Sequence, residues 1–147
     1  DLLELTQQLA GTFQALLIEK GIECAIHGEA VLISADRDKI HQVVTNLLYN
    51  AIKFTPSGGH IDLQVSQISG VASFKITDTG QGIPPNEINQ VFERFYMAEP
   101  SRNRKLGGQG IGLSIVKSII KAHHGNITVK SDYGKGSTFT VILPVKR

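Results

Sequence analysis

The stretch Asn46-Leu-Leu-Tyr-Asn50-Ala-Ile-Lys53 lies in a predicted helix with two chemically different faces. Apolar residues recur at helical spacing through this segment, which indicates a buried face. Asn46, Asn50 and Lys53 follow at i, i+4 and i+7, so they share a second face. An asparagine amide oxygen is a hard ligand that suits Mg²⁺, and a lysine ammonium is a point charge that suits phosphate. The alternative is a solvated polar face, because polar stripes at this spacing are common.

Capping and turn residues set the limits of this helix and of the strands after it. Asp36 can cap its beginning, and Pro56 ends it near Thr55, because the residue before a proline avoids the α region. Alternating apolar and polar residues then predict a hairpin of strands 60–67 and 71–77. Two final strands, 126–131 and 138–143, flank a glycine-containing turn.

The remaining elements decide the fold class. They are a first helix from residue 2 that stops at Gly21, short strands at 23–27 and 31–34 around Gly28, a helix-like stretch at 86–96 and an apolar helix at 111–123. Most strands follow one another without a crossover helix, which argues against a doubly wound fold. We therefore predict an α+β, two-layer α/β sandwich, in which a mixed, largely antiparallel sheet packs against about three helices.

A second motif, Asp78-Thr-Gly80-Gln-Gly82-Ile-Pro84, ends the second strand of the hairpin. A carboxylate there can accept a hydrogen bond from an exocyclic amine such as that of adenine, and small residues let a ligand approach the backbone. The alternative is an Asp-initiated turn, which accounts for most Asp-Thr-Gly sequences. A calcium loop is excluded, because the glycines occupy positions where that loop needs ligands.

Glycines also precede the apolar helix, at Gly107, Gly108, Gly110 and Gly112. Free backbone amides and the positive end of a helix favour an anion such as phosphate. The pattern is neither a P-loop nor a dinucleotide-binding fingerprint, because no Gly-Lys-Ser/Thr follows and no strand directly precedes it. The basic stretch 97–109 predicts a mobile lid over phosphates, with a disordered surface loop as the alternative.

Composition narrows the possible partners. The 147 residues, 41% hydrophobic and 19% charged, are ordinary for one globular domain, which we expect to span residues 1–147. A net charge of +2 with scattered basic residues gives no basis for a nucleic-acid partner. Cys24 is the only cysteine, so an internal disulfide is excluded. No apolar run approaches the ~20 residues of a membrane-spanning helix, so direct membrane contact is not expected.

With these motifs in view, the chain resembles the catalytic, ATP-binding domain of a sensor histidine kinase, of the GHKL or Bergerat ATPase superfamily. The resemblance covers roughly residues 35–145. Five segments carry it: 46–56 resembles the N box, 78–84 the G1 box, 92–96 the F box, 108–113 the G2 box and 134–139 the final glycine motif. The resemblance implies a Bergerat fold with a mobile ATP lid, and ATP and Mg²⁺ as ligands.

The resemblance also assigns roles by position. Asn50 would coordinate Mg²⁺ with help from Asn46, and Lys53 would contact phosphate; these three are the implied catalytic residues. Phe54 would lie beside adenine, and Asp78 would bind its amine. The other implied nucleotide-binding residues are Gly80, Gly82, Ile83, Gly108, Gly110, Ile111, Gly112, Leu113 and Ser137.

Two departures from the family pattern concern phosphate. Met97 stands where many relatives have an arginine that helps bind phosphate, and His41 is followed by Gln42, which is not the phosphoacceptor pattern. The acceptor histidine is therefore expected on a dimerisation domain before Asp1.

The implied function is to bind Mg·ATP and donate the γ-phosphate to that histidine, from which a response regulator takes it. The parent protein is expected to be a cytoplasmic, homodimeric kinase that a membrane anchor can tether.

Three other interpretations remain. An ATPase clamp like gyrase B, MutL or heat-shock chaperones is disfavoured, because those relatives carry a glutamate where this chain has Asn46. An anti-sigma-type serine kinase shares the fold, but the F box and the run 46–56 favour the histidine-kinase interpretation. A degenerate nucleotide-binding module is opposed by the intact N, G1 and G2 boxes.

Overall fold

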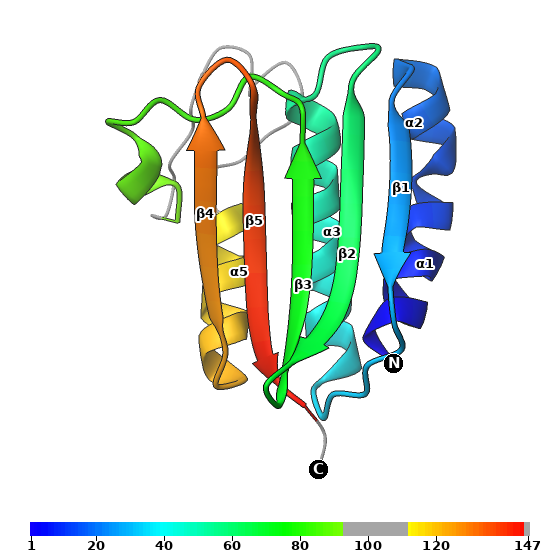
Figure 1. Cartoon of the computed structure of the whole chain (residues 1–147), viewed down its shortest axis with the longest axis vertical. Helices are drawn as coiled ribbons and strands as arrows, with labels where there is room; N and C mark the ends of the chain where they lie inside the picture. The colour runs from blue at the N-terminus through cyan, green and yellow to red at the C-terminus, as the bar shows by residue number, and fades with distance from the viewer. Residues whose placement is uncertain (93–111, 146–147) are drawn as a thin grey trace.

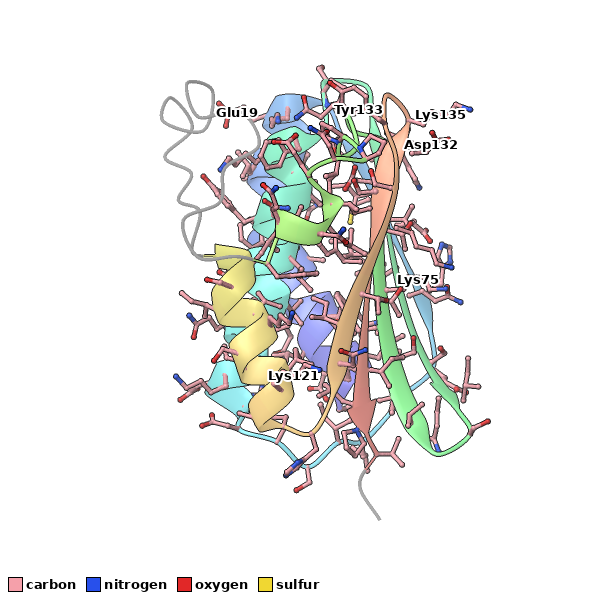
Figure 2. The ribbon with its side chains drawn as sticks, turned by 90° about the vertical axis from the view of Figure 1, so that its left-hand side faces the viewer. Glu19, Lys75, Lys121, Asp132, Tyr133 and Lys135 are labelled. Carbon is pink, nitrogen blue, oxygen red and sulfur yellow. The ribbon has the colours of Figure 1, made fainter. Side chains whose placement is uncertain are left out.

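The computed structural model describes residues 1–92 and 112–145 (Figure 1). The helices in this part are α1 (Leu2–Thr12), α2 (Gln14–Lys20), α3 (Arg37–Phe54), the 3₁₀ helix η1 (Ile88–Gln90) and α5 (Gly112–Ala122). The strands are β1 (Glu23–Gly28), β2 (His60–Ile68), β3 (Val71–Asp78), β4 (Asn126–Asp132) and β5 (Gly136–Pro144). The helices α1, α2, α3 and α5 cover one face of the sheet and leave the other face open (Figures 1 and 2).

The strands form a five-stranded sheet in the order β1-β2-β3-β5-β4. Only the pair β1–β2 is parallel, and the other three pairs are antiparallel. The hairpins β2–β3 and β4–β5 therefore supply most of the sheet, as expected from strands that follow one another without a crossover helix. The predicted α+β sandwich with a mixed, largely antiparallel sheet is confirmed.

The N-terminal elements differ from the prediction. Residues 31–34 form no strand; the backbone N–H of Leu2 donates to the carbonyl of Val31 at 2.9 Å, and Val31 is buried. This segment therefore closes the start of α1, and β1 pairs with β2 instead of forming a hairpin. The first predicted helix is also split at Phe13, after the weak helix formers Gly11 and Thr12. As a result, residues 1–92 and 112–145 contain four α-helices rather than about three.

The core lies between the helices and the inward-facing side chains of the sheet. Alternate residues of β2, β3 and β5 are buried, as their apolar-polar alternation predicts. The largest fully buried side chains come from α3, α5 and these strands: Leu47, Leu48, Ile52, Ile61, Leu63, Phe74, Ile76 and Ile120. Lys75 points away from the helices on the open face (Figure 2). None of the helices in residues 1–92 and 112–145 is long and apolar enough to cross a membrane.

Both ends of α5 are joined to α3, one at the start of α3 and the other near its middle. The His123 ring accepts a hydrogen bond at Nε2 from the backbone N–H of Asp36 (3.1 Å), and its Nδ1 lies 2.8 Å from the carbonyl oxygen of Ile119. These partners fit the neutral ring with its proton on Nδ1. Near the other end, Asn46 Nδ2 lies 3.5 Å from the carbonyl oxygen of Gly112. The position of the predicted metal-binding face relative to the start of α5 is thereby set.

Candidate functional site

The predicted polar face of α3 lies at the edge of the core. The helix is fixed at its start by the Asp36 carboxylate, which accepts from two backbone N–H groups, and at its end by Thr55, whose hydroxyl donates to Ala51. Asn46, Asn50 and Lys53 are all half-buried. This half-burial is unlike the fully solvated stripe that was the alternative.

Lys53 and Phe54 end α3 as a contacting pair. The Lys53 ammonium lies 5.2 Å from the centroid of the Phe54 ring, which is within cation–π range. Partial burial lowers the pKa of Lys53. A partly desolvated cation has a stronger interaction with an anion than a fully hydrated one, so this side chain is suited to a phosphate group.

Three polar residues form a row across the inner face of the sheet. The inward alternations of β3 and β4 end in Asp78 and Ser131, and that of β5 begins with Ser137; the inward positions next to them are apolar. Asp78 pairs with Ser137, and Ser137 pairs with Ser131, so the three are aligned in register. Asp78 and Ser137 are each only 8% exposed. The sheet therefore places a carboxylate and two hydroxyls at the edge of an apolar core.

Burial sets the protonation behaviour of Asp78. Desolvation raises the pKa of this carboxyl, and hydrogen bonds from the backbone N–H groups of Gly80 and Ser137 oppose the shift. The Gly80 N–H donates to Oδ1 at 2.9 Å. A carboxylate has about four acceptor positions, so these two bonds leave capacity for a further donor. Because few water molecules reach this position, a ligand N–H group directed at Asp78 meets little competition.

The turn after Asp78 is held against two other segments. A Cβ added at Gly80 would lie 2.5 Å from the Phe54 carbonyl oxygen, so the turn touches the end of α3. On its other side, Ser131 Oγ accepts from Ile83 N at 2.6 Å and donates to the Gly136 carbonyl at 3.0 Å. Gly82 packs against the backbone of residue 132, at the β4–β5 turn where Tyr133 and Lys135 are labelled in Figure 2.

The structure brings many of the predicted site residues to one end of the sandwich. Phe54, Asp78 and Gly80 are adjacent, and the contacts above tie the G1 turn to Ser137 through Ser131. Asn46 meets Gly112, the first residue of α5, and the next residue, Leu113, packs against the core. The predicted site residues Gly108, Gly110 and Ile111, the position Met97 and the predicted lid 97–109 lie outside the described residues.

Sequence reasoning did not find Ser131, although a signal for it was present. In β4 the inward positions run Ile127, Val129 and Ser131, so the alternation places a hydroxyl at the strand end, as it places Asp78 in β3. Ser131 Oγ also lies 3.2 Å from Ser137 Oγ. A search for polar residues at either end of an apolar alternation would have found all three members of the row.

We expect Gly136→Ala to lower the free energy of unfolding by several kcal/mol and to displace Asp78. Gly136 has φ +148, and a Cβ would lie 2.0 Å from the backbone carbonyl oxygen of Asp78, so the two backbones must separate and the Asp78 carboxylate shifts with its own. Gly134→Ala is the matched control: its φ is +90, but nothing lies within 4 Å, so only backbone strain of about 1–3 kcal/mol applies. Urea unfolding of both variants checks this. Equal losses would mean that the contact with Asp78 has no effect.

The donor chemistry of the site fits a hard cation bound together with its ligand. Within the described ranges 1–92 and 112–145, no group of three or more His, Cys, Asp and Glu side chains could hold a metal. Asn46 and Asn50, one helical turn apart, present amide oxygens instead. With Asn46 Nδ2 directed at Gly112, its Oδ1 remains an acceptor. Such a site suits Mg²⁺, which keeps most of its ligands as water and substrate phosphate oxygens.

The chain matches a known family over most of its length. Residues 35–147 match the family described as "Histidine kinase-, DNA gyrase B-, and HSP90-like ATPase". The chain is 42% identical over 116 residues to the sensor histidine kinase WalK of Bacillus subtilis (strain 168), across 78% of this chain and 19% of WalK. The chain therefore spans about a fifth of the length of that relative.

Solved structures with the same fold are histidine kinases. The nucleotide-free catalytic domain of ThkA matches with a TM-score of 0.84 and 26% identity, over 96% of this chain and 90% of that one. Full-length ShkA in complex with AMPPNP matches with a TM-score of 0.85 and 32% identity, over 99% of this chain and 30% of ShkA. ThkA in complex with the response regulator protein TrrA shares the fold at 24% identity and a TM-score of 0.79, over 97% and 40% of the two chains.

Proposed function

Because this chain belongs to the histidine kinase-, DNA gyrase B- and HSP90-like ATPases, and is a catalytic, ATP-binding domain of the sensor histidine kinase type, we propose that it binds Mg·ATP and donates the γ-phosphate to a histidine on a separate domain. The observation that carries the proposal is Asp78, a buried carboxylate with unused acceptor capacity at the end of an apolar core. That position suits the exocyclic amine of adenine, and AMPPNP in the ShkA complex supports an adenine nucleotide.

Each side chain has a role that its surroundings permit. Asp78 accepts from the adenine amine, while the Phe54 ring at the end of α3 supplies an apolar wall for the base. Gly80, Gly82 and Ile83 form the floor beside Asp78, and Ser137 belongs to the polar row behind it. These contacts fix the base and leave the phosphates to extend along the polar face of α3.

The phosphates meet that polar face and the start of α5. Asn50, assisted by Asn46, would hold Mg²⁺, which when bound neutralises charge on the phosphate oxygens. Lys53 is a point charge for phosphate, and the backbone amides of Gly112 and Leu113 at the start of α5 favour an anion. We include Gly108, Gly110 and Ile111 in this phosphate site by sequence position. Phosphoryl transfer then depends mainly on positioning and charge neutralisation.

The second candidate is a conformational clamp that hydrolyses ATP, and Asn46 argues against it. A carboxylate at this position can accept a proton from an attacking water, whereas an amide cannot. In this structure the Asn46 NH₂ group lies 3.5 Å from the Gly112 carbonyl oxygen, so the residue acts there as a hydrogen-bond donor. The acceptor is therefore proposed to be a histidine rather than water.

The proposed partners follow from this chemistry. We propose residues 1–147 as one catalytic domain that acts on the phosphoacceptor and dimerisation domain of the same, homodimeric kinase. A response regulator would take the phosphate onward, and the ThkA–TrrA complex supports that class of partner. We place the domain in the cytoplasm, where ATP and Mg²⁺ are available, with tethering of the parent protein to a membrane as an option.

The test combines the chain with γ-labelled ATP, Mg²⁺ and a phosphoacceptor domain supplied in trans. We expect label on the acceptor that is lost in acid and kept in alkali, as phosphohistidine behaves. Acid-stable label would indicate a serine kinase instead. Steady release of inorganic phosphate without labelled protein would indicate the ATPase clamp, and failure to bind ATP at all would overturn the proposal.

A further inference from the structure

The C-terminal end of α3 is held by a cation from a different helix. Lys20, the last residue of α2, donates from Nζ to the carbonyl oxygens of Ile52 at 2.6 Å and Thr55 at 3.1 Å. A third carbonyl, that of Lys53, lies at 3.5 Å. The last carbonyls of a helix have no partner within it and carry the negative end of its dipole. The half-buried ammonium therefore supplies donors to these carbonyls, of which that of Ile52 also accepts a longer bond, 3.4 Å, from Thr55 N.

Further hydrogen bonds attach the turn after Lys20 to the turn after α3. Gly58 N donates to the Gly21 carbonyl at 2.9 Å, and Glu23 N donates to the Gly59 carbonyl at 3.1 Å. A Cβ added at Gly21 would lie 3.0 Å from Ser57 Oγ, so the two turns are in direct contact. The attachment therefore involves the backbone of both turns as well as the Lys20 side chain.

This attachment continues to the neighbour of Asp78. His60 N donates to Thr79 Oγ1 at 2.9 Å, and Thr79 N donates to the His60 carbonyl at 3.1 Å. A Cβ added at Gly59 would lie 3.0 Å from the same Thr79 Oγ1. A continuous set of contacts thus joins the end of α2 to both the end of α3 and the Asp78 turn.

We propose that Lys20 is a positioning residue for the nucleotide site. Its ammonium fixes the last turn of α3, which carries Lys53 and Phe54, and the Phe54 carbonyl lies against Gly80. The three carbonyls are backbone groups of that turn, so Lys20 acts on the site through the placement of these side chains. The inference rests on the proposed nucleotide binding, and it involves a residue outside the range 35–147 that matches the family.

The alternative is that Lys20 stabilises the fold without affecting the ligand. The positioning role and the purely stabilising role differ in one expectation: only the first predicts that an uncharged variant, although folded, binds the nucleotide more weakly. Lys20→Met keeps most of the apolar stem and removes the charge and the donor. Lys20→Arg restores a cation with donors, and Lys39→Met removes an exposed lysine from the other end of α3 as the matched control.

The experiment measures the affinity for AMPPNP with Mg²⁺ by calorimetry, well below the unfolding temperature of every variant. We expect Lys20→Met to weaken binding about three- to tenfold, Lys20→Arg to recover most of the loss and Lys39→Met to bind as the wild type does. In the nucleotide-free protein, we expect amide hydrogen exchange at Thr55–Gly59 to be faster in Lys20→Met. Should Lys20→Met not fold, Lys20→Gln takes its place.

The outcomes separate this inference from the proposed function. If the wild type does not bind AMPPNP, the proposed function fails and the role of Lys20 fails with it. If the wild type binds and Lys20→Met binds equally well, only the positioning role is wrong. Faster exchange with unchanged affinity would also contradict the positioning role, because the contacts would then serve the fold alone.

Discussion

Asp78→Asn is expected to weaken ATP binding about ten- to hundredfold, the range for loss of a hydrogen bond to a charged group. The change keeps the shape of the side chain, which is 8% exposed. It removes a desolvated charge and weakens two backbone hydrogen bonds, which act in opposite directions on the fold. We therefore expect the free energy of unfolding to stay within about 1 kcal/mol of the wild-type value.

The orientation of the new amide in Asp78→Asn explains the expected loss of ATP affinity and predicts a change in the preference for ATP over GTP. The Gly80 N–H donates to Oδ1 of residue 78, so an asparagine that keeps this bond has its oxygen toward Gly80 and its NH₂ in place of Oδ2. That NH₂ opposes the amine of adenine but can donate to the O6 acceptor of guanine. The ratio of ATP to GTP affinity should therefore fall. Calorimetry with both nucleotides measures it.

The raised pKa of Asp78 gives the same residue a pH signature. The folded chain takes up a proton there at a higher pH than the unfolded chain does. The contribution of Asp78 to the free energy of unfolding thus increases as pH falls through the raised pKa. ATP affinity should decrease as pH falls through the same pKa, because the adenine amine needs the ionised carboxylate. Asp78→Asn should lack both effects.

Asp62→Asn is the control, because Asp62 is a half-buried carboxylate on β2 whose partner is His27 at 2.6 Å on the neighbouring strand β1. It should leave ATP affinity and the ATP-to-GTP ratio unchanged. If Asp78→Asn also left both unchanged, Asp78 would not be the residue that contacts the base.

The sheet was largely predictable from the sequence because its strands are local. The hairpins β2–β3 and β4–β5 each pair residues that a short turn separates, so alternation and turn residues suffice. The parallel pair β1–β2 was missed, since its two strands are separated by the whole of α3 and no local pattern specifies their register. The same alternation, followed to the edge where β3 and β4 end and β5 begins, contains the row Asp78, Ser131 and Ser137.

The candidate site was likewise predictable in its local features and not in its long-range contacts. The face of α3 follows from helical spacing, and half-burial of Asn46, Asn50 and Lys53 agrees with it. The contacts of Lys20 with Ile52 and Thr55 could not be predicted, because they join residues more than thirty positions apart and a lysine before a glycine is an ordinary helix end. Contacts of this kind depend on how the helices pack, which the local pattern does not encode.

Asn50→Ala is expected to reduce Mg²⁺-dependent transfer to an acceptor domain by at least about a hundredfold, because even residues that only orient a metal ligand contribute 10–100-fold. The fold should tolerate the change, because alanine is the best helix former and the side chain is only half-buried. Gln42→Ala is the control: Gln42 is a half-buried amide on the same helix, two turns before Asn50. Transfer of labelled phosphate to the acceptor measures both variants.

Nucleotide affinity separates the metal role of Asn50 from a role in binding the base. If Asn50 holds Mg²⁺, the cation should raise ATP affinity in the wild type and in Gln42→Ala but much less in Asn50→Ala. Without Mg²⁺, all three should bind alike, since Asp78 and Phe54 remain in place. Loss of affinity without Mg²⁺ would mean that Asn50 contacts the nucleotide directly. Unchanged transfer would exclude it as an essential ligand, and the amide of Asn46 would then be the remaining candidate on this face of α3.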